Sequence, residues 1–192
     1  MFSLKDISPS ITDMIRFDHS HVMLTSHQYV VTKKSTVKKA LAEIMCDALE
    51  IHSTLEEETF YPALRQLGMG GSTLEKSVPQ HLEMRNMIAK IRQADPATPR
   101  YDQLVSELMR DVMHHVADEE TILLPEAERM LGKTRLNELG VQMSKRRMQL
   151  LGPKAGKVAM NTFVGFSSST TAVVLSAVSA LLVGRFLTKK LM

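Results

Sequence analysis

A repeated motif of histidine, glutamate and proline constrains the fold of this chain more than any other sequence feature. Two segments, beginning at His52 and at His115, match the pattern H-x3-E-E-x4-P, and the second follows the first by 63 residues. A further histidine precedes each copy: His19 lies 33 residues before His52, and His81 lies 34 residues before His115. The sequence therefore predicts a duplicated helical hairpin, in which each half presents one histidine and then a His-x3-Glu pair.

Helix-forming residues fill most of the chain up to residue 151, and the alternation typical of strands is scarce. Breaks are expected at the glycine-rich residues 68–71 and the proline-containing residues 95–99. Four helix starts are predicted: Thr12 or Asp13, Ser35 or Thr36, a capping box at Ser72 and Glu75, and about Tyr101. Helices with short connections favour an all-α fold, an antiparallel up-down four-helix bundle.

Charge divides the chain into an acidic body and a basic end. Residues 1–131 carry 14 basic and 20 acidic side chains, whereas residues 132–192 carry 10 basic side chains and one acidic side chain. We expect a bundle over 10–131, a basic linker helix over 132–157 and a hydrophobic tail helix over 158–187. This distribution disfavours a nucleic-acid-binding protein. The single cysteine, Cys46, excludes an intramolecular disulfide and a thiolate metal cluster.

The repeat predicts a metal site. His52 and Glu56 lie four residues apart, so both point to the same face of a helix, and the same holds for His115 and Glu119. Unpaired histidines and carboxylates inside a bundle are costly, and divalent cations offset that cost. Nitrogen and oxygen donors without thiolates suit iron or manganese, with zinc as an alternative. The predicted metal ligands are His19, His52, Glu56, His81, His115 and Glu119.

Two pairs of neighbouring histidines leave the register of the site open. His19 gives the better match between the two halves, and His21 is its rival. His115 aligns with His52, but the adjacent His114 would pair with Asp118 instead. The sequence alone leaves both alternatives standing.

At these residues the sequence resembles the hemerythrin-like HHE cation-binding family. The resemblance covers about residues 10–131 and implies an up-down bundle with a non-haem di-iron centre. It implies that the four histidines are terminal ligands, whereas Glu56 and Glu119 bridge the two iron ions. Two features depart from the oxygen-carrying hemerythrins: Arg85 stands four residues after His81, and the last helix has His-x3-Glu in place of His-x4-Asp.

The expected function is metal binding with a small molecule as partner. The resemblance implies a di-iron protein that binds or reacts with O2, NO or peroxide. One alternative is a di-iron enzyme that consumes peroxide or oxidises ferrous iron. Another is a membrane adaptor or signalling protein that uses the bundle structurally and forms homo-oligomers.

The C-terminal segment predicts attachment to a membrane. Residues 158–184 contain no charged side chain, and 27 helical residues would span about 40 Å, enough for a bilayer core of roughly 30 Å. Small residues at Ala172, Ser176 and Ala180 suit contacts between helices in lipid. Cations on both flanks suggest contact with anionic lipid. We expect a membrane location with the bundle on the cytoplasmic side, or a soluble cytoplasmic protein as the alternative.

Overall fold

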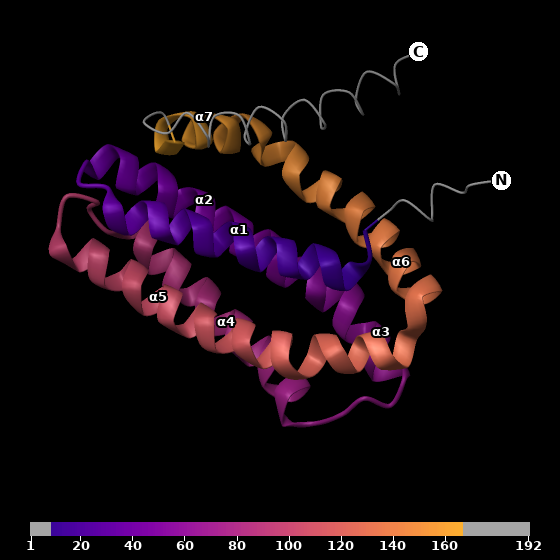
Figure 1. Cartoon of the computed structure of the whole chain (residues 1–192). Coiled ribbons are helices and arrows are strands. Elements are labelled where there is room, and N and C mark those ends of the chain that lie inside the picture. The colour runs from indigo at the N-terminus through magenta and orange to yellow at the C-terminus, as the bar shows by residue number, and fades with distance from the viewer. Residues whose placement is uncertain (1–8, 167–192) are drawn as a thin grey trace, which may run out of the picture.

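The computed structural model describes residues 9–166, and all the regular structure in this range is helical, which confirms the predicted all-α class. Figure 1 shows the arrangement. The helices are α1 (Ile11–Val31), α2 (Ser35–Leu55), η2 (Glu56–Phe60), α3 (Tyr61–Gln66), α4 (Ser72–Gln93), α5 (Pro99–Asp118), η3 (Glu119–Leu123), α6 (Leu124–Leu151), η4 (Gly152–Lys154) and α7 (Ala155–Phe166).

Two helical hairpins form the bundle. Helix α1 packs against α2, and α4 packs against α5, as Figure 1 shows. The chain continues from α2 through η2 into α3, and from α5 through η3 into α6, so each half of the sequence repeat supplies one hairpin.

The helix starts differ in part from those predicted. Helix α1 is capped by Ser10, whose Oγ accepts a hydrogen bond from the Asp13 backbone, while the Asp13 carboxylate accepts one from the Ser10 backbone. The predicted cap at Ser72 is wrong. Gly71, with a φ of 146°, occupies the position before α4, and no side chain caps this helix.

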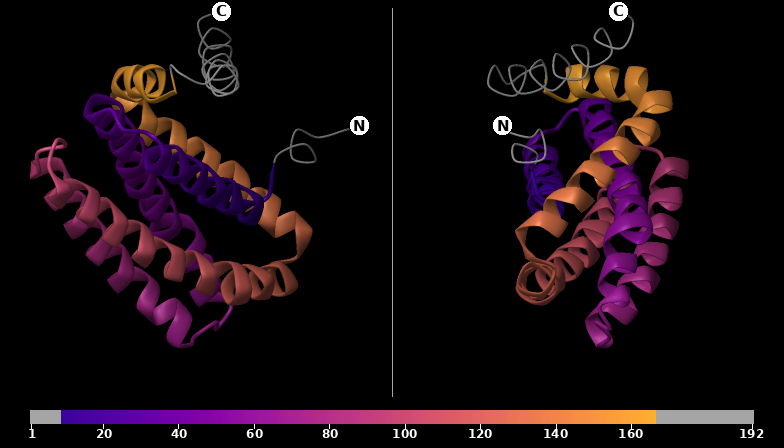
Figure 2. Two further views of the ribbon diagram at one scale, coloured as in Figure 1. Left: turned by 60° about the vertical axis from the view of Figure 1, so that its left-hand side comes forward. Right: turned by 90° about the vertical axis from the view of Figure 1, so that its right-hand side faces the viewer.

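Helix α6 changes direction at Gly132, the first residue after the predicted bundle over 10–131. Gly132 has a φ of 67°, a left-handed conformation that glycine adopts without strain. The second half of α6 then packs against α1, as Figure 2 shows. At Gly140 the two helices are so close that an added Cβ would lie 2.3 Å from the Pro9 carbonyl oxygen.

The hydrophobic core forms two clusters along the bundle axis. One includes Leu41, Ile88 and Leu108, and the other includes Ile15 and Leu55. Helices α1, α2 and α4 contribute to both clusters, whereas α5 contributes to the first and its continuation through η3 into α6 contributes to the second. A buried histidine lies at or near the junction between the clusters in each of the four bundle helices. Apolar side chains therefore surround the polar centre at both ends and keep bulk water away from it.

The basic end of the chain docks on the acidic bundle. Arg146 pairs with Glu58, Arg147 with Asp18, Lys154 with Asp47 and Glu50, and Lys157 with Glu43 and Asp47. The expectation that these four cations face anionic lipid is therefore wrong. Their charges are balanced by carboxylates of the same chain.

The prediction of a membrane location is likewise corrected. Among residues 9–166, no helix has the length and apolar character that a membrane crossing requires. The described start of the predicted tail belongs to α7, which packs against α2: Phe166 is buried, and the Gly165 backbone lies beside Leu41. The rest of that tail, residues 167–187, lies outside the described residues, as do the small residues Ala172, Ser176 and Ala180.

Candidate metal centre

The structure brings together all six residues that the repeat singles out. Their side chains come from α1, α2, η2, α4, α5 and η3, and each residue is at most 4% exposed to solvent. The rival histidines, His21 and His114, are exposed on the outside of their helices. Burial therefore distinguishes His19 and His115 from their neighbours.

Two short π-helical turns position the glutamates. One begins at Glu56 and the other at Glu119, and in each the next hydrogen bond spans five residues: Tyr61 N–H to Glu56 O, and Leu124 N–H to Glu119 O. Proline stands six residues after each glutamate. A proline lacks the N–H for the usual bond and its ring collides with the carbonyl four residues earlier, so a wider turn relieves the clash. The repeated proline thus accounts for the matching shape of the two turns.

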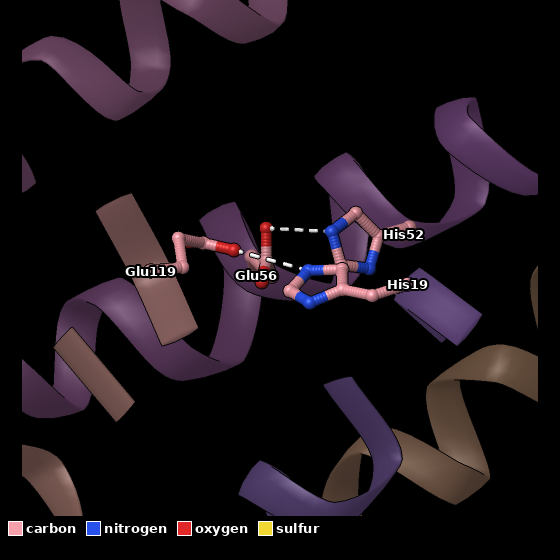
Figure 3. A group of neighbouring side chains, drawn as sticks. All are labelled: His19, His52, Glu56 and Glu119. Atoms are coloured by element: carbon pink, nitrogen blue, oxygen red, sulfur yellow. Dashed lines mark ion pairs between the residues drawn. The ribbon is translucent and has the colours of Figure 1, made fainter. Parts of the chain in front are cut away.

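Four donors converge on what we call the first position, shown in Figure 3: His19, His52, Glu56 and Glu119. One ligand atom from each lies within 4.8 Å of all the others. His19 Nε2 is 3.3 Å from Glu119 Oε2, and His52 Nε2 is 3.2 Å from Glu56 Oε2. The sticks in Figure 3 show both imidazoles directed at the carboxylates.

Three donors form the second position: Glu56, His81 and His115. His81 Nε2 lies 3.4 Å from Glu56 Oε2 and 3.1 Å from His115 Nε2. Tyr61 lies beside this group, where its hydroxyl donates to Glu119 Oε1 at 2.8 Å and is 3.1 Å from Glu56 Oε2. Because Glu56 belongs to both positions, its carboxylate is placed to bridge two cations.

Each histidine is oriented by an oxygen atom facing its Nδ1. The partners are Glu120 for His19 (2.8 Å), Asp18 for His52 (3.4 Å), Glu57 for His81 (2.9 Å) and Gln80 for His115 (3.0 Å). Because an oxygen acceptor holds the proton on Nδ1, the Nε2 atom turned toward the centre keeps its lone pair free. This is the tautomer that a metal ligand requires.

Two arginines complete the surroundings of the centre. Arg85, which stands four residues after His81, turns away from the centre and donates to Glu57 Oε1 at 2.7 Å and to Ser53 Oγ at 3.1 Å. Arg147, from the second half of α6, donates to both oxygens of Asp18 at 2.6 and 2.7 Å. Sequence reasoning missed Arg147, because only the change of direction at Gly132 brings it near Asp18.

The electrostatics of the centre shift the pKa values of its two carboxyl groups in opposite directions. Burial, and next the neighbouring Glu119 carboxylate, raise the pKa of Glu56 to about 8. Burial also opposes a charge on His19, but the Glu119 carboxylate outweighs it and raises the pKa of His19 to about 9. At His115 burial prevails and lowers the pKa to about 4. In the metal-free centre the His19–Glu119 pair therefore carries the charges, while Glu56 and His115 are neutral. A cation bound at this place would replace the proton on His19 Nε2.

The donor set fits divalent cations. Four buried atoms of the first position lack a hydrogen-bond partner: His19 Nε2, His52 Nε2, Glu56 Oε1 and Glu119 Oε2. Buried polar atoms without partners cost free energy, and coordination to a cation would remove that cost. Imidazole nitrogens and carboxylate oxygens in this ratio suit iron, manganese or zinc.

Comparisons with known proteins find a related sequence and a solved structure of similar fold. A DNA nickase of Nostoc sp. (strain PCC 7120 / SAG 25.82 / UTEX 2576) is 31% identical over 115 residues, which make up 59% of this chain and 32% of that protein. The chain thus spans about a third of that relative's length. The crystal structure of a hemerythrin HHE cation binding domain-containing protein from Mycobacterium kansasii superposes with a TM-score of 0.66 at 18% identity, covering 88% of this chain and 99% of that one.

The family is shown by the sequence itself. The sequence model of the hemerythrin HHE cation binding domain matches residues 10–127, which include all six residues of the centre. These residues form a helical bundle whose histidines and glutamates meet in its interior. The chain therefore belongs to the hemerythrin HHE cation-binding domain family.

Proposed function

We propose that the chain is a non-haem di-iron protein that binds or reacts with O2, NO or peroxide at the bundle centre. The observation that carries this proposal is the pair of donor groups that share Glu56. His19, His52, Glu56 and Glu119 would hold one ion, and Glu56, His81 and His115 would hold the other. Manganese or zinc would fit the same donors.

The protein's own residues prepare the site for such chemistry. Iron, when bound, supplies the electrons and the open coordination positions. The acceptors at Nδ1 fix the direction of the four imidazoles, and the two apolar clusters exclude bulk water. The first position has four protein donors and the second has three, with Glu56 counted in both. Coordination positions are therefore left at each ion for a small molecule.

A second candidate is turnover of peroxide, which the position of Tyr61 favours. Its hydroxyl is buried and hydrogen-bonded to Glu119, beside His81. A phenol at this place can hold a proton next to a reacting oxygen species. The net reaction would convert two molecules of hydrogen peroxide into dioxygen and two of water.

Metal analysis tests the proposal. We expect about two iron ions per chain after anaerobic reconstitution, and near-ultraviolet absorption of an oxo-bridged centre after exposure to air. His115→Ala should lose iron, whereas His114→Ala, its exposed neighbour, should retain both ions. A protein that takes up no iron, or an equal loss in both variants, would contradict the proposal. Peroxide consumption that exceeds one equivalent per chain would distinguish the enzyme from a binding protein.

A further inference from the structure

The two halves of the repeat differ at the residue that precedes the first histidine. This residue is Asp18 in the first half and Gln80 in the second. Both have the same structural role: Asp18 Oδ2 faces His52 Nδ1 at 3.4 Å, and Gln80 Oε1 faces His115 Nδ1 at 3.0 Å. One imidazole is therefore supported by a carboxylate and its counterpart by a neutral amide.

We call the residue whose oxygen faces the Nδ1 atom of a histidine its support. The supports of His19 and His81 each come from the opposite half of the repeat. Glu120 of the second half faces His19, and Glu57 of the first half faces His81. The histidines of the first position thus rest on two carboxylates, Asp18 and Glu120. Those of the second position rest on one carboxylate, Glu57, and on Gln80.

Charge compensation does not remove this difference. Arg147 pairs with Asp18, and Arg85 pairs with Glu57, so each position has one arginine and one neutralised carboxylate. Arg16, the cation whose charge acts on Glu120, forms its own ion pair with Glu128. The first position therefore keeps one more negative charge among its supports than the second.

Two further observations point in the same direction. The first position has four protein donors and the second has three. Of the four buried atoms at the centre without hydrogen-bond partners, three belong to the first position alone, and the fourth, Glu56 Oε1, belongs to the residue that the two positions share. At the second position, by contrast, the Nε2 atoms of His81 and His115 contact each other at 3.1 Å, and Tyr61 lies 3.4 Å from His81.

We infer that the two cation positions are unequal: the first fills before the second, and Gln80 is the positioning residue that keeps the second one weaker. This inference rests on the proposed function, since it presumes two cations. A carboxylate that accepts from Nδ1 makes the imidazole a stronger ligand, and changes at such supports alter metal affinity about 10- to 100-fold. We therefore expect the two affinities to differ by about 10-fold or more.

Calorimetric titration of the full-length, metal-free protein with Co²⁺ tests the inference, and the visible absorption of Co²⁺ reports its coordination. The wild type should show two separable binding events. His115→Ala should lose the weaker event and retain the tighter one, and His52→Ala should lose the tighter one. The exposed variant His114→Ala serves as the control and should show both events unchanged.

Substitution of the supports gives the decisive measurement. Gln80→Glu preserves the shape of the side chain and should strengthen the weaker event about 10-fold while leaving the tighter event unchanged. The added charge lies one turn from Lys76, which now pairs with Asp118, and this limits the cost to folding. Asp18→Asn should weaken the tighter event. Circular dichroism checks that both variants are folded, and Gln80→Glu decides the matter if Asp18→Asn is not.

The outcomes separate this inference from the function on which it rests. Two equal binding events in the wild type, or a Gln80→Glu variant with unchanged affinities, would overturn the inequality and leave the metal centre standing. Tighter binding at the second position than at the first would also overturn the inequality. A protein that binds no Co²⁺, Fe²⁺ or Zn²⁺ would overturn the proposed function itself.

Discussion

Arg147 donates to both carboxylate oxygens of Asp18 and so connects the second half of α6 to the support of a candidate ligand. Asp18 Oδ2 also faces His52 Nδ1 at 3.4 Å. Arg147 lies 20 residues beyond the end of the family match at residue 127. The C-terminal half of α6 is therefore part of the environment of the centre as well as part of the fold.

Replacing Arg147 should destabilise the protein. In Arg147→Gln, Asp18, whose side chain is 13% exposed, loses its bidentate partner. Removal of one member of a largely buried pair leaves an uncompensated charge, and we expect a loss of about 2–3 kcal/mol in the free energy of unfolding. Urea denaturation of the metal-free protein measures this loss.

The adjacent Arg146 offers a matched control. It pairs with Glu58 on the surface, where both side chains are about two-fifths exposed, so solvent screens the interaction. Arg146→Gln should therefore unfold at nearly the same urea concentration as the wild type. Equal midpoints for the two variants would show that the Arg147–Asp18 pair does not hold α6 in place.

Gly140 should tolerate no side chain. A Cβ at this position would lie 2.3 Å from the Pro9 carbonyl oxygen, a backbone atom at the start of α1 that cannot move independently. We expect Gly140→Ala to lower the free energy of unfolding by about 1–3 kcal/mol, because α6 must shift away from α1. Gly156→Ala, where nothing lies within 4 Å, should be neutral or stabilising by up to about 1 kcal/mol. Thermal unfolding of both variants compares them, and an unchanged Gly140→Ala would argue against the close contact.

The sequence is sufficient to predict which residues converge inside the bundle where periodicity and repetition act together. Spacing of four residues places His52 and Glu56 on one face of a helix, and the second copy repeats the pattern. The adjacent glutamate of each copy has a less obvious role: Glu57 supports His81 of the other half. That role depends on how the two hairpins pack, which local spacing does not encode.

The structure departs from the sequence-based expectation where contacts are distant in the chain. The cations of α6, η4 and α7 favour a membrane interpretation when they are considered beside an uncharged segment, but Lys154 and Lys157 pair with Asp47 on α2. Nothing local to residues 145–157 indicates this, because the partners lie about 100 residues earlier. The net charge is −6 in residues 1–131 and +9 in residues 132–192. These opposite charges are equally consistent with docking of the basic end on the acidic bundle of the same chain.

Cys46 should be unreactive in the native protein. Burial raises the pKa of this thiol to about 12, so at pH 8 the nucleophilic thiolate is scarcely populated. Because the folded-state pKa lies above the ordinary value of 9.0, the folded chain retains the proton longer, and stability should fall as the pH rises above 9. A disulfide reagent at pH 8 should modify Cys46 in urea but not without it. The Cys46→Ala variant isolates the part of the alkaline destabilisation that comes from the thiol, and rapid labelling of the native protein would contradict its burial.

Tyr61 provides the sharpest distinction between a binding protein and an enzyme. Its hydroxyl donates to Glu119 Oε1 at 2.8 Å, and Tyr61→Phe removes this hydrogen bond without removing any candidate ligand. Metal stoichiometry should therefore stay unchanged, whereas peroxide consumption by the iron-loaded protein should fall about 100-fold if the phenol transfers a proton. Tyr29→Phe is the matched control, because the Tyr29 hydroxyl donates to Asp102 at 2.6 Å and takes no part in the centre. Equal rates for the two variants would assign Tyr61 a packing role, while loss of iron from Tyr61→Phe would show that its hydrogen bond is needed to hold Glu119 in a binding geometry.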